Sequence, residues 1–339
     1  MDTLFDQPYD LEAAKENALR ILLDAKKLVI STHNNPDGDA IGSALAVYNF
    51  AREHGIDATV VNHSETPYNF EFLEGAKDIR KYQPGRDDEI FDQADTIFVV
   101  DLNAGKRLKS VEAPIERSNA VKVLIDHHME PVKFTDHWVI DYDASSAGEI
   151  IYKVLARAGK GKISRASAEA LYVAIMTDTG SFRFPRTDPE VHRIIADLIE
   201  CGANPVRMYE EVYNVMPANA AKLLGVALSG MEFYNDGALC VMTINRNQFR
   251  ETGSKGPDVE GIVENTHAIA GVKLGVLMSE DLDEDEIRMS FRSKDEVPAR
   301  DLAMQFGGGG HFHAAGARVK HTTMDELKSR LVELSKQYL

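Results

Sequence analysis

The chain has 339 residues, with 38 Lys and Arg against 54 Asp and Glu, which gives a formal net charge of −16. This length predicts about two domains, and 44% hydrophobic residues is typical of a globular protein. The two cysteines, Cys201 and Cys240, are too few for a disulfide framework and favour a reducing compartment. The acidic balance excludes a protein that coats long nucleic acid electrostatically. It leaves small phosphorylated substrates open if a metal supplies positive charge.

The N-terminal sequence MDTLFDQPYD has neither the basic start nor the apolar segment of a secretory signal. The apolar runs along the chain are all too short to span a bilayer. We therefore expect a cytoplasmic protein without membrane contact.

Short apolar runs alternate with helical stretches through the first half of the chain. Apolar runs with little polar alternation are typical of parallel strands that are covered on both faces. Their order of strand, helix and strand predicts a doubly wound, mainly parallel sheet. The expected strands are 28–30, 58–61, 96–100 and 121–125, and the expected helices are 40–53, 166–177 and 191–201.

Two proline-containing steps, Asn204-Pro205 and Met216-Pro217, interrupt the pattern after residue 201. We expect a first domain at 1–203, a helical linker at 204–225, and a smaller mixed α/β domain at 226–339. The expected strands of this second domain are 238–244, 272–278 and 286–291, and the expected helices are 259–270, 297–306 and 323–338. The last two strands are close enough to form a hairpin.

The densest polar signal is the segment HNNPDGDAIGS, residues 33–43, directly after the first expected strand. Ligands of doubly wound sheets bind beyond the carboxyl ends of the strands. His33, Asp37 and Asp39 therefore stand at the usual binding edge, where Pro36 and Gly38 allow a tight turn. Imidazole and carboxylate ligands suit Mn²⁺ or a similar ion. A simple turn with Asp39 as a helix cap is the alternative, which three candidate ligands in one short loop disfavour.

Further candidate ligands follow the other strands and one helix. Asp101 follows the expected strand 96–100, and the motif Asp126-His127-His128 ends the expected strand 121–125. Asp178 lies at the end of an apolar helix, where a carboxylate opposes the helix dipole unless a cation compensates it. Because parallel strand ends meet at one edge, these side chains can form a two-metal cluster.

Four motifs in order carry a resemblance to the DHH phosphoesterase superfamily. They are HNNPDGDAIGS, the strand-end Asp101, Asp126-His127-His128, and the segment TDTG at 177–180. The segment GGGGHFHAAGA at 307–317 is similar to the signature of the DHH-associated domain. The chain most resembles the bacterial nano-RNases that also act as 3′-phosphoadenosine-5′-phosphate phosphatases.

The resemblance implies two divalent ions, with Mn²⁺ preferred and Mg²⁺ or Co²⁺ as alternatives. The implied ligands are His33, Asp37, Asp39, Asp101, His127 and Asp178. Asp101 would bridge the two ions, Asp126 would orient the imidazoles, and His128 would contact the scissile phosphate. The implied reactions are hydrolysis of short RNA to mononucleotides and of 3′-phosphoadenosine 5′-phosphate to AMP.

The second domain supplies the expected substrate-binding residues. Gly307, Gly308, Gly309 and Gly310 let backbone N–H groups approach an anion, and a helix starting after them would add a favourable dipole. The resemblance makes this run, with His311 and His313, the pocket for the nucleotide. Arg292 is a candidate phosphate clamp, because its fork is planar and bidentate. A salt bridge with the acidic turn 280–286 is the alternative for Arg292.

Two other functions remain open from the sequence. One is a soluble phosphodiesterase for cyclic dinucleotides or their linear products, and the other is a nucleotide-binding regulatory module with an inactive metal site. A family II pyrophosphatase would lack the glycine pocket, and a RecJ-like exonuclease would be longer. The expected partners are short single-stranded oligonucleotides or small phosphorylated nucleotides, not long duplex DNA. The family suggests a homodimer.

Overall fold

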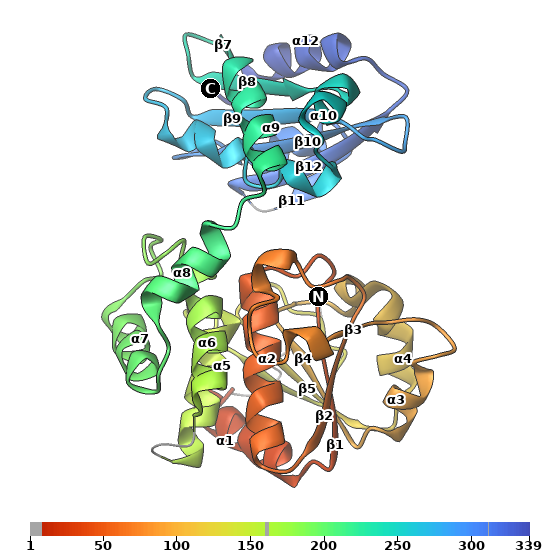
Figure 1. The fold of residues 1–339 in the computed structure, drawn as a ribbon, viewed down its shortest axis with the longest axis vertical. Coiled ribbons are helices and arrows are strands. Elements are labelled where there is room, and N and C mark those ends of the chain that lie inside the picture. The colour runs from red at the N-terminus through yellow and green to blue at the C-terminus, as the bar shows by residue number, and fades with distance from the viewer. Residues whose placement is uncertain (1–8, 160–162, 311) are drawn as a thin grey trace. The chain divides into compact units, whose positions relative to one another are not determined.

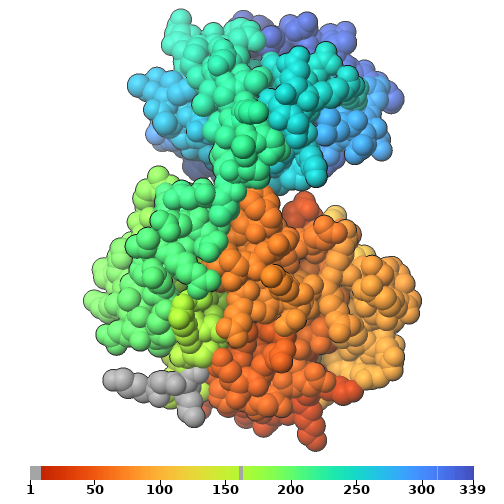
Figure 2. All heavy atoms as spheres, viewed as in Figure 1, coloured from red at the N-terminus to blue at the C-terminus, as the bar shows by residue number. Residues whose placement is uncertain are grey.

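The structure is a computed structural model that describes residues 9–159, 163–310 and 312–339 (Figure 1). It divides into two compact units, Met1–Val215 and Met216–Leu339. The division falls within the expected linker, between helices α8 (Pro205–Tyr213) and α9 (Ala218–Ser229). Figure 2 shows the surface of each unit from the same side as Figure 1. None of the helices in the described part of the chain is long and apolar enough to cross a membrane.

In its described residues, the first unit has a six-stranded sheet in the order β3-β2-β1-β4-β5-β6. All neighbouring strands pair in parallel, which confirms the predicted doubly wound sheet. The strands are β1 (Lys27–Thr32), β2 (Asp57–Asn62), β3 (Arg80–Lys81), β4 (Thr96–Val100), β5 (Val121–Asp126) and β6 (His137–Ile140). The order reverses between β1 and β4, and such a switch point is where ligands of open α/β sheets bind.

Helices cover both faces of this sheet (Figure 1). Side chains alternate along a strand, so Ile30 packs with Leu45 on one face while Val29 packs with Phe91 on the other. This double burial explains why the strands read as continuous apolar runs. The first face carries α1 (Leu11–Asp24), α2 (Gly38–Glu53), α5 (Ala147–Leu155) and α6 (Arg165–Asp178). Helices α7 (Pro189–Glu200) and α8 pack on α6. The second face carries α3 (Asp88–Gln93) and α4 (Glu112–Arg117).

Short 3₁₀ segments complete the first unit. They are η1 (Tyr68–Phe70), η2 (Ala76–Asp78), η3 (Gly105–Val111) and η4 (Ala156–Ala158).

Helices α2 and α6 approach unusually closely, and small residues allow it. A Cβ added to Gly42 of α2 would lie 2.4 Å from the carbonyl oxygen of Ala170 in α6. The tight turn expected at Gly38 lies elsewhere. Gly38 is the first residue of α2, and the left-handed conformation before it belongs to Asn35, with φ of 52°.

The second unit is the predicted smaller, mixed α/β domain. Over the residues described there, its sheet has the order β11-β12-β10-β9-β8-β7, and only β8 and β9 pair in parallel. The strands are β7 (Glu232–Tyr234), β8 (Leu239–Ile244), β9 (Leu274–Glu280), β10 (Glu286–Ser293), β11 (Gly309–Gly310) and β12 (Ala314–Lys320). Antiparallel pairing of β9 with β10 confirms the expected hairpin.

Helices also cover this second sheet on both faces. Leu223 of α9 and Phe249 of α10 pack with Met242 and Leu277, whereas Leu302 and Leu327 pack with the opposite side of the sheet. The helices are α9 and α10 (Arg246–Thr252) on one face, and α11 (Ala299–Met304) and α12 (Met324–Ser335) on the other.

Two expectations for the second unit are wrong. The helix expected at 259–270 is replaced by 3₁₀ segments η5 (Gly256–Val259) and η6 (Val263–Ala268), because Gly261 has φ of 79° and interrupts any α-helix there. The glycine run leads into a strand and not into a helix. Gly309 and Gly310 pair with β12, which itself pairs along the length of β10.

Candidate metal centre

The carboxylates of Asp37 and Asp39, at the start of α2, have different surroundings. Asp37 caps α2, since its Oδ1 accepts a hydrogen bond from the N–H of Ala40 at 3.0 Å, while its side chain stays exposed. Asp39 is not a cap. It lies in the first turn of α2 and is buried, with 1% exposure. The cap alternative for Asp39 is therefore wrong.

The carboxylate of Asp39 is held by the start of helix α5. It accepts hydrogen bonds from the N–H groups of Ala147 at 2.7 Å and Gly148 at 2.9 Å, and from the hydroxyl of Ser43 at 3.1 Å. A helix N-terminus stabilises a negative charge. Burial outweighs these bonds and, with the nearby charge of Asp37, raises the pKa of Asp39 to about 7. A cation beside Asp39 would offset that cost of burial.

Asp101 stands at the end of β4, next to the switch point of the sheet. Its φ of 60° is left-handed, and its N–H donates to the carbonyl of Ile125 at 2.9 Å. The side chain is buried, and burial together with the carboxylates of Asp39 and Asp37 raises its pKa well above the usual value. A strained, buried acid at this position is a feature of functional sites.

The imidazoles of His33 and His127 are fixed by backbone carbonyls. Nδ1 of His33 lies 2.9 Å from the carbonyl of Asn34, and Nδ1 of His127 lies 3.3 Å from that of Ala144. Burial lowers the pKa of both imidazoles, which favours the neutral ring. A ring that donates through Nδ1 presents a lone pair at Nε2, which is the form that ligates metals.

Both Nε2 atoms point at carboxylate oxygens. His33 Nε2 is 3.3 Å from Asp101 Oδ2 and 3.9 Å from Asp37 Oδ1. His127 Nε2 is 3.4 Å from Asp178 Oδ2, 3.8 Å from Asp39 Oδ2 and 3.7 Å from Asp101 Oδ1. Lone pairs facing lone pairs are unfavourable unless a cation lies among them.

These contacts form two adjoining groups of ligand atoms. One group is His33, Asp37 and Asp101; the other is Asp39, His127 and Asp178. In each group the ligand atoms lie within 4.8 Å of one another. Asp101 directs one oxygen towards His33 and the other towards His127, as a bridging ligand would. The donor set therefore fits two divalent ions, and the structure brings all six sequence-predicted ligands together.

His128 makes a different set of contacts. Its Nδ1 lies 2.7 Å from Asp126 Oδ1, while the other oxygen of that buried carboxylate makes no hydrogen bond. His128 also forms a possible ligand group with Asp101 and His127. Its Nε2 lies 3.4 Å from Nη1 of Arg107, a residue of η3 that sequence reasoning missed.

Nothing in the sequence around Arg107 marks it as part of the site. It reaches the centre because η3 folds back on the loop after β1, where the N–H of Asn34 donates to the carbonyl of Arg107 at 2.9 Å. The guanidinium adds a positive charge beside a cluster rich in carboxylates, where a phosphate could bind.

The predicted substrate residues lie in the second unit. Arg292 does not pair with the acidic turn, as the alternative proposed. Its Nε and Nη2 lie 3.0 and 2.8 Å from Oε1 of Glu264. His313 Nδ1 lies 3.2 Å from the hydroxyl of Ser293, which neighbours Arg292 on β10. The predicted residue His311 lies outside the described residues.

Two glycines of the run, Gly308 and Gly310, have no room for a side chain. A Cβ on Gly308 would lie 2.1 Å from the carbonyl oxygen of Gly316, and one on Gly310 would lie 2.5 Å from that of Ala314. His267, which sequence spacing did not single out, belongs to the same region. Burial lowers its pKa, and the charges of Lys294, Arg292 and His313 lower it further.

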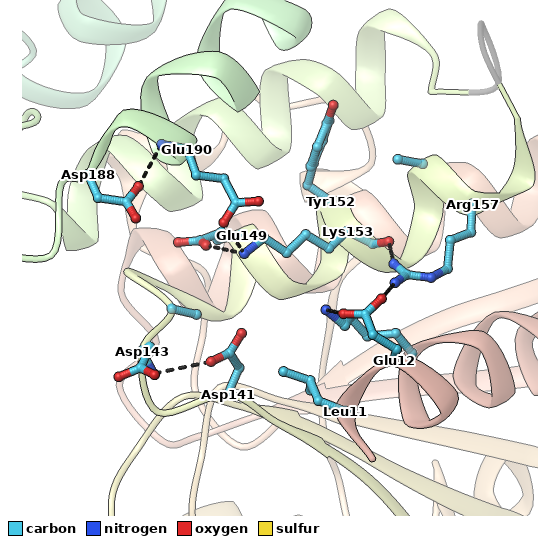
Figure 3. Close-up of a pocket in the computed structure, with 13 residues that line it drawn as sticks. Leu11, Glu12, Asp141, Asp143, Glu149, Tyr152, Lys153, Arg157, Asp188 and Glu190 are labelled. Carbon is cyan, nitrogen blue, oxygen red and sulfur yellow. Dashed lines mark hydrogen bonds and ion pairs between the residues drawn. The ribbon is translucent and has the colours of Figure 1, made fainter.

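A separate pocket of about 670 Å³ lies on the first unit, and Figure 3 shows its charged lining. Lys153 lies 2.7 Å from Glu149 and 2.9 Å from Glu190, and Arg157 is paired with Glu12. None of the predicted metal ligands lines it. Its three cations, Lys15, Lys153 and Arg157, all pair with carboxylates of the lining, and it has no histidine, so the metal cluster is the stronger candidate site.

Comparisons with known proteins agree with this fold and site. Residues 27–175 match the DHH family, N-terminal domain, and residues 236–339 match the DHHA1 domain. The chain is 28% identical over 330 residues to the bifunctional oligoribonuclease and PAP phosphatase NrnA of Thermus thermophilus, covering 95% of this chain and 94% of the relative. The NrnA of Bacillus subtilis is 26% identical over 307 residues, covering 90% and 93%.

A solved structure from Bacteroides fragilis, described as an exopolyphosphatase-related protein, shares 30% identity with this chain. It has a TM-score of 0.91, and the match covers 96% of this chain and 97% of that one. The match thus spans nearly the whole of both chains. The chain belongs to the DHH family, with a DHHA1 domain following its DHH domain.

Proposed function

We propose that the protein is a metal-dependent phosphoesterase that hydrolyses short RNA oligonucleotides to mononucleotides and 3′-phosphoadenosine 5′-phosphate to AMP. The observation that carries the proposal is the pair of ligand groups joined at Asp101. Two relatives that match nearly the whole chain are named as oligoribonucleases and PAP phosphatases, which supports this choice of substrates.

The proposed cofactor is a pair of divalent ions, with Mn²⁺ favoured. His33, Asp37 and Asp101 would hold one ion, and Asp39, His127 and Asp178 would hold the other. Mixed imidazole and carboxylate ligands suit Mn²⁺. Two such ions supply an activated water and charge neutralisation for in-line attack at a phosphate.

The chain's own residues have separate tasks in this proposal. Asp126 accepts a hydrogen bond from the Nδ1–H of His128 and fixes the ring, so that Nε2 faces the side of the cluster where Arg107 lies. Arg107 can then donate to an oxygen of the scissile phosphate, and the doubly protonated form of His128 would donate to the same oxygen through Nε2–H. Asp39 and Asp101 are buried, so water screens their charges little. Their interaction with a bound cation is therefore stronger than it would be at the surface.

The net charge of the protein favours short substrates over long ones. A net charge of −16 repels a long polyanion, whereas a short substrate needs only the metal centre and a small set of cationic groups. In the DHHA1 domain, Arg292 supplies a cation, and His313 and the glycines of β11 are the other predicted contacts. We propose that they bind the nucleotide portion of the substrate.

The test is Asp101→Asn, which keeps the size of the side chain and removes the shared charge. We expect the variant to fold, to bind fewer Mn²⁺ ions by calorimetry and elemental analysis, and to lose at least about 10³-fold in turnover of diadenylate and 3′-phosphoadenosine 5′-phosphate. Asp24→Asn is the matched control, because Asp24 is an exposed acid on α1. Undiminished turnover by Asp101→Asn would refute the two-metal mechanism.

A substrate panel separates this function from its alternatives. Wild-type protein with Mn²⁺ is given dinucleotides, longer oligomers, 3′-phosphoadenosine 5′-phosphate and cyclic dinucleotides. Faster turnover of cyclic dinucleotides would replace the proposed substrate class. Binding of metal and nucleotide without any turnover would instead identify a regulatory module.

A further inference from the structure

An exposed aromatic ring lies in the loop that follows the candidate ligand Asp178. The loop 179–187, which joins α6 to α7, begins directly after the candidate ligand Asp178 (Figure 1). Phe184 in this loop is 53% exposed, an unusual state for a large apolar side chain, and it lies between the exposed Arg183 and Arg186. The combination of an open aromatic face and two cations calls for a functional explanation.

The loop is firmly built. Gly180, Ser181 and Phe182 have φ of 56°, 58° and 65°, a left-handed run that residues other than glycine seldom adopt. The turn buries Phe182 against Tyr172, with ring centroids 5.9 Å apart, and the N–H of Phe182 donates to the hydroxyl of Thr179 at 3.1 Å. Residues 183–186 therefore face outward on a fixed base.

Phe184 has a defined position within the loop. The carbonyl of Thr179 accepts hydrogen bonds from the N–H groups of both Arg183 and Phe184, at 2.9 and 3.0 Å. The ring lies over Gly180, where an added Cβ would come within 2.5 Å of Phe184 Cζ. Arg183 Nε donates to the carbonyl of Gly180 at 2.7 Å. One face of the ring rests on glycine, which leaves aromatic surface open to a ligand.

Two independent links tie the loop to the cluster. Gly180 is only two residues beyond Asp178, so their Cα atoms are at most about 7.6 Å apart. At the other end of the loop, Arg186 Nη1 donates to the carbonyl of Ala144 at 3.4 Å, and that same carbonyl is the partner of His127 Nδ1. The ring and both guanidinium groups thus lie within reach of a nucleoside whose phosphate is at the metals.

We infer that Phe184 is a platform on which a nucleobase next to the scissile phosphate stacks, with Arg183 and Arg186 attracting the phosphates on either side of it. Every base has a π-face, so stacking of this kind tolerates any sequence, as an enzyme for short RNA requires. A sugar phosphate or an inorganic polyphosphate has no ring to place there. The inference rests on the proposed function and adds a source of selectivity for nucleobase-bearing phosphoesters.

The experiment is a thermodynamic cycle in which the Phe184 ring is removed from the protein and a nucleobase is removed from the substrate, separately and together. Wild type and Phe184→Ala are assayed on diadenylate and on its two analogues in which one adenosine is replaced by an abasic ribose. For one of these analogues we expect wild type to lose about tenfold in kcat/KM. Phe184→Ala should show a similar loss on diadenylate and no further loss on that analogue. Phe184→Trp should keep most of the activity, and Phe184→Leu should not.

Phe233→Ala is the matched control, since Phe233 is a 49% exposed phenylalanine on β7 of the DHHA1 domain. It should match wild type on all three substrates. The platform hypothesis is overturned if Phe184→Ala has the kcat/KM of wild type, or if its kcat/KM falls equally on intact and abasic substrates.

Failure of the proposed function looks different, because wild type itself would then hydrolyse no dinucleotide. In that event, calorimetric binding of AMP and of ribose 5-phosphate decides the question. Weaker AMP binding by Phe184→Ala, with ribose 5-phosphate unaffected, supports the platform, and equal AMP binding by both proteins overturns it.

Discussion

Gly38 and Thr177 face each other across the contact between α2 and α6, so closely that a Cβ added to Gly38 would lie 2.4 Å from Thr177 Oγ1. Each residue is adjacent to a candidate ligand, Asp39 in one helix and Asp178 in the other. The same contact that packs the two helices therefore sets the separation of two candidate ligands, which we propose hold one ion.

Gly38→Ala should separate these helices at the metal centre. Thr177 cannot yield easily, because its hydroxyl donates to the carbonyls of Val173 and Ala174. We expect a loss of roughly 1–3 kcal/mol in the free energy of unfolding, as for overpacked cores. Mn²⁺ affinity should fall about tenfold or more, and calorimetry with chemical denaturation measures both.

Gly225→Ala is the control for this substitution. Gly225 lies in the exposed interior of α9 with no heavy atom near an added Cβ. That variant should be more stable by about 0.5–1 kcal/mol, and its metal affinity should equal that of wild type. Unchanged metal affinity in Gly38→Ala would contradict the link between helix packing and ligand spacing.

The pH dependence of the metal-free protein should reveal the buried Asp39. Its pKa of about 7 lies above the ordinary value of 3.8, so the folded state holds its proton more tightly than the unfolded state does. As pH rises from about 4 to 7, the unfolded state loses this proton first, and the free energy of unfolding falls. Above pH 7 the contribution is constant, and bound metal should restore the stability.

Melting curves of wild type and Asp39→Asn in chelator, from pH 4 to 8, measure this effect. The variant should lose less stability than wild type over that range, because the titrating group is gone. Asp24→Asn should follow wild type, since Asp24 is exposed. Parallel pH profiles for Asp39→Asn and wild type would show that Asp39 does not titrate in this way.

Arg107 should act on the phosphate and not on metal binding. Its guanidinium lies beside His128 Nε2, and Arg107 belongs to neither of the two proposed ligand groups, His33, Asp37 and Asp101 or Asp39, His127 and Asp178. Arg107→Ala should therefore lower kcat about 10²-fold, as loss of one transition-state donor does, while the Mn²⁺ content stays unchanged. Lys106→Ala, an exposed neighbouring cation, should have wild-type kinetics. A parallel loss of metal from Arg107→Ala would assign it a structural role.

Arg292 should govern substrate affinity from the DHHA1 domain. Its fork is now held by Glu264, and a substrate phosphate would share it. Arg292→Ala should raise KM for 3′-phosphoadenosine 5′-phosphate roughly tenfold, with a smaller change in kcat. Arg292→Lys should recover only part of the loss, because lysine lacks the bidentate fork.

Arg318→Ala is the matched control for Arg292. Arg318 lies on the adjacent strand β12 and forms its ion pair with Glu286 at the other end of β10. It should leave KM unchanged, and an equal increase in KM for both variants would point to a general loss of positive charge.

The sequence by itself predicted which residues make up the candidate metal cluster. Parallel strands end at one edge of a sheet, so acids and histidines placed after β1, β4 and β5 must converge there, whatever the details of packing. His33, Asp101 and His127 could be assigned to one site for that reason. The DHH and DHHA1 motifs made the same assignment through residue type and order.

Only the tertiary structure decided which further groups meet this cluster. The hydrogen bonds from α5 to Asp39, the approach of Arg107 to His128 and the link from Arg186 to Ala144 all depend on contacts between segments far apart in the chain. The glycine run shows the same limit. With no side chains to express a preference, its conformation was set by pairing with β12, and so it became a strand. Local sequence patterns predict where the strands end. Which side chains from other segments face those strand ends depends on long-range packing, which the sequence patterns do not show.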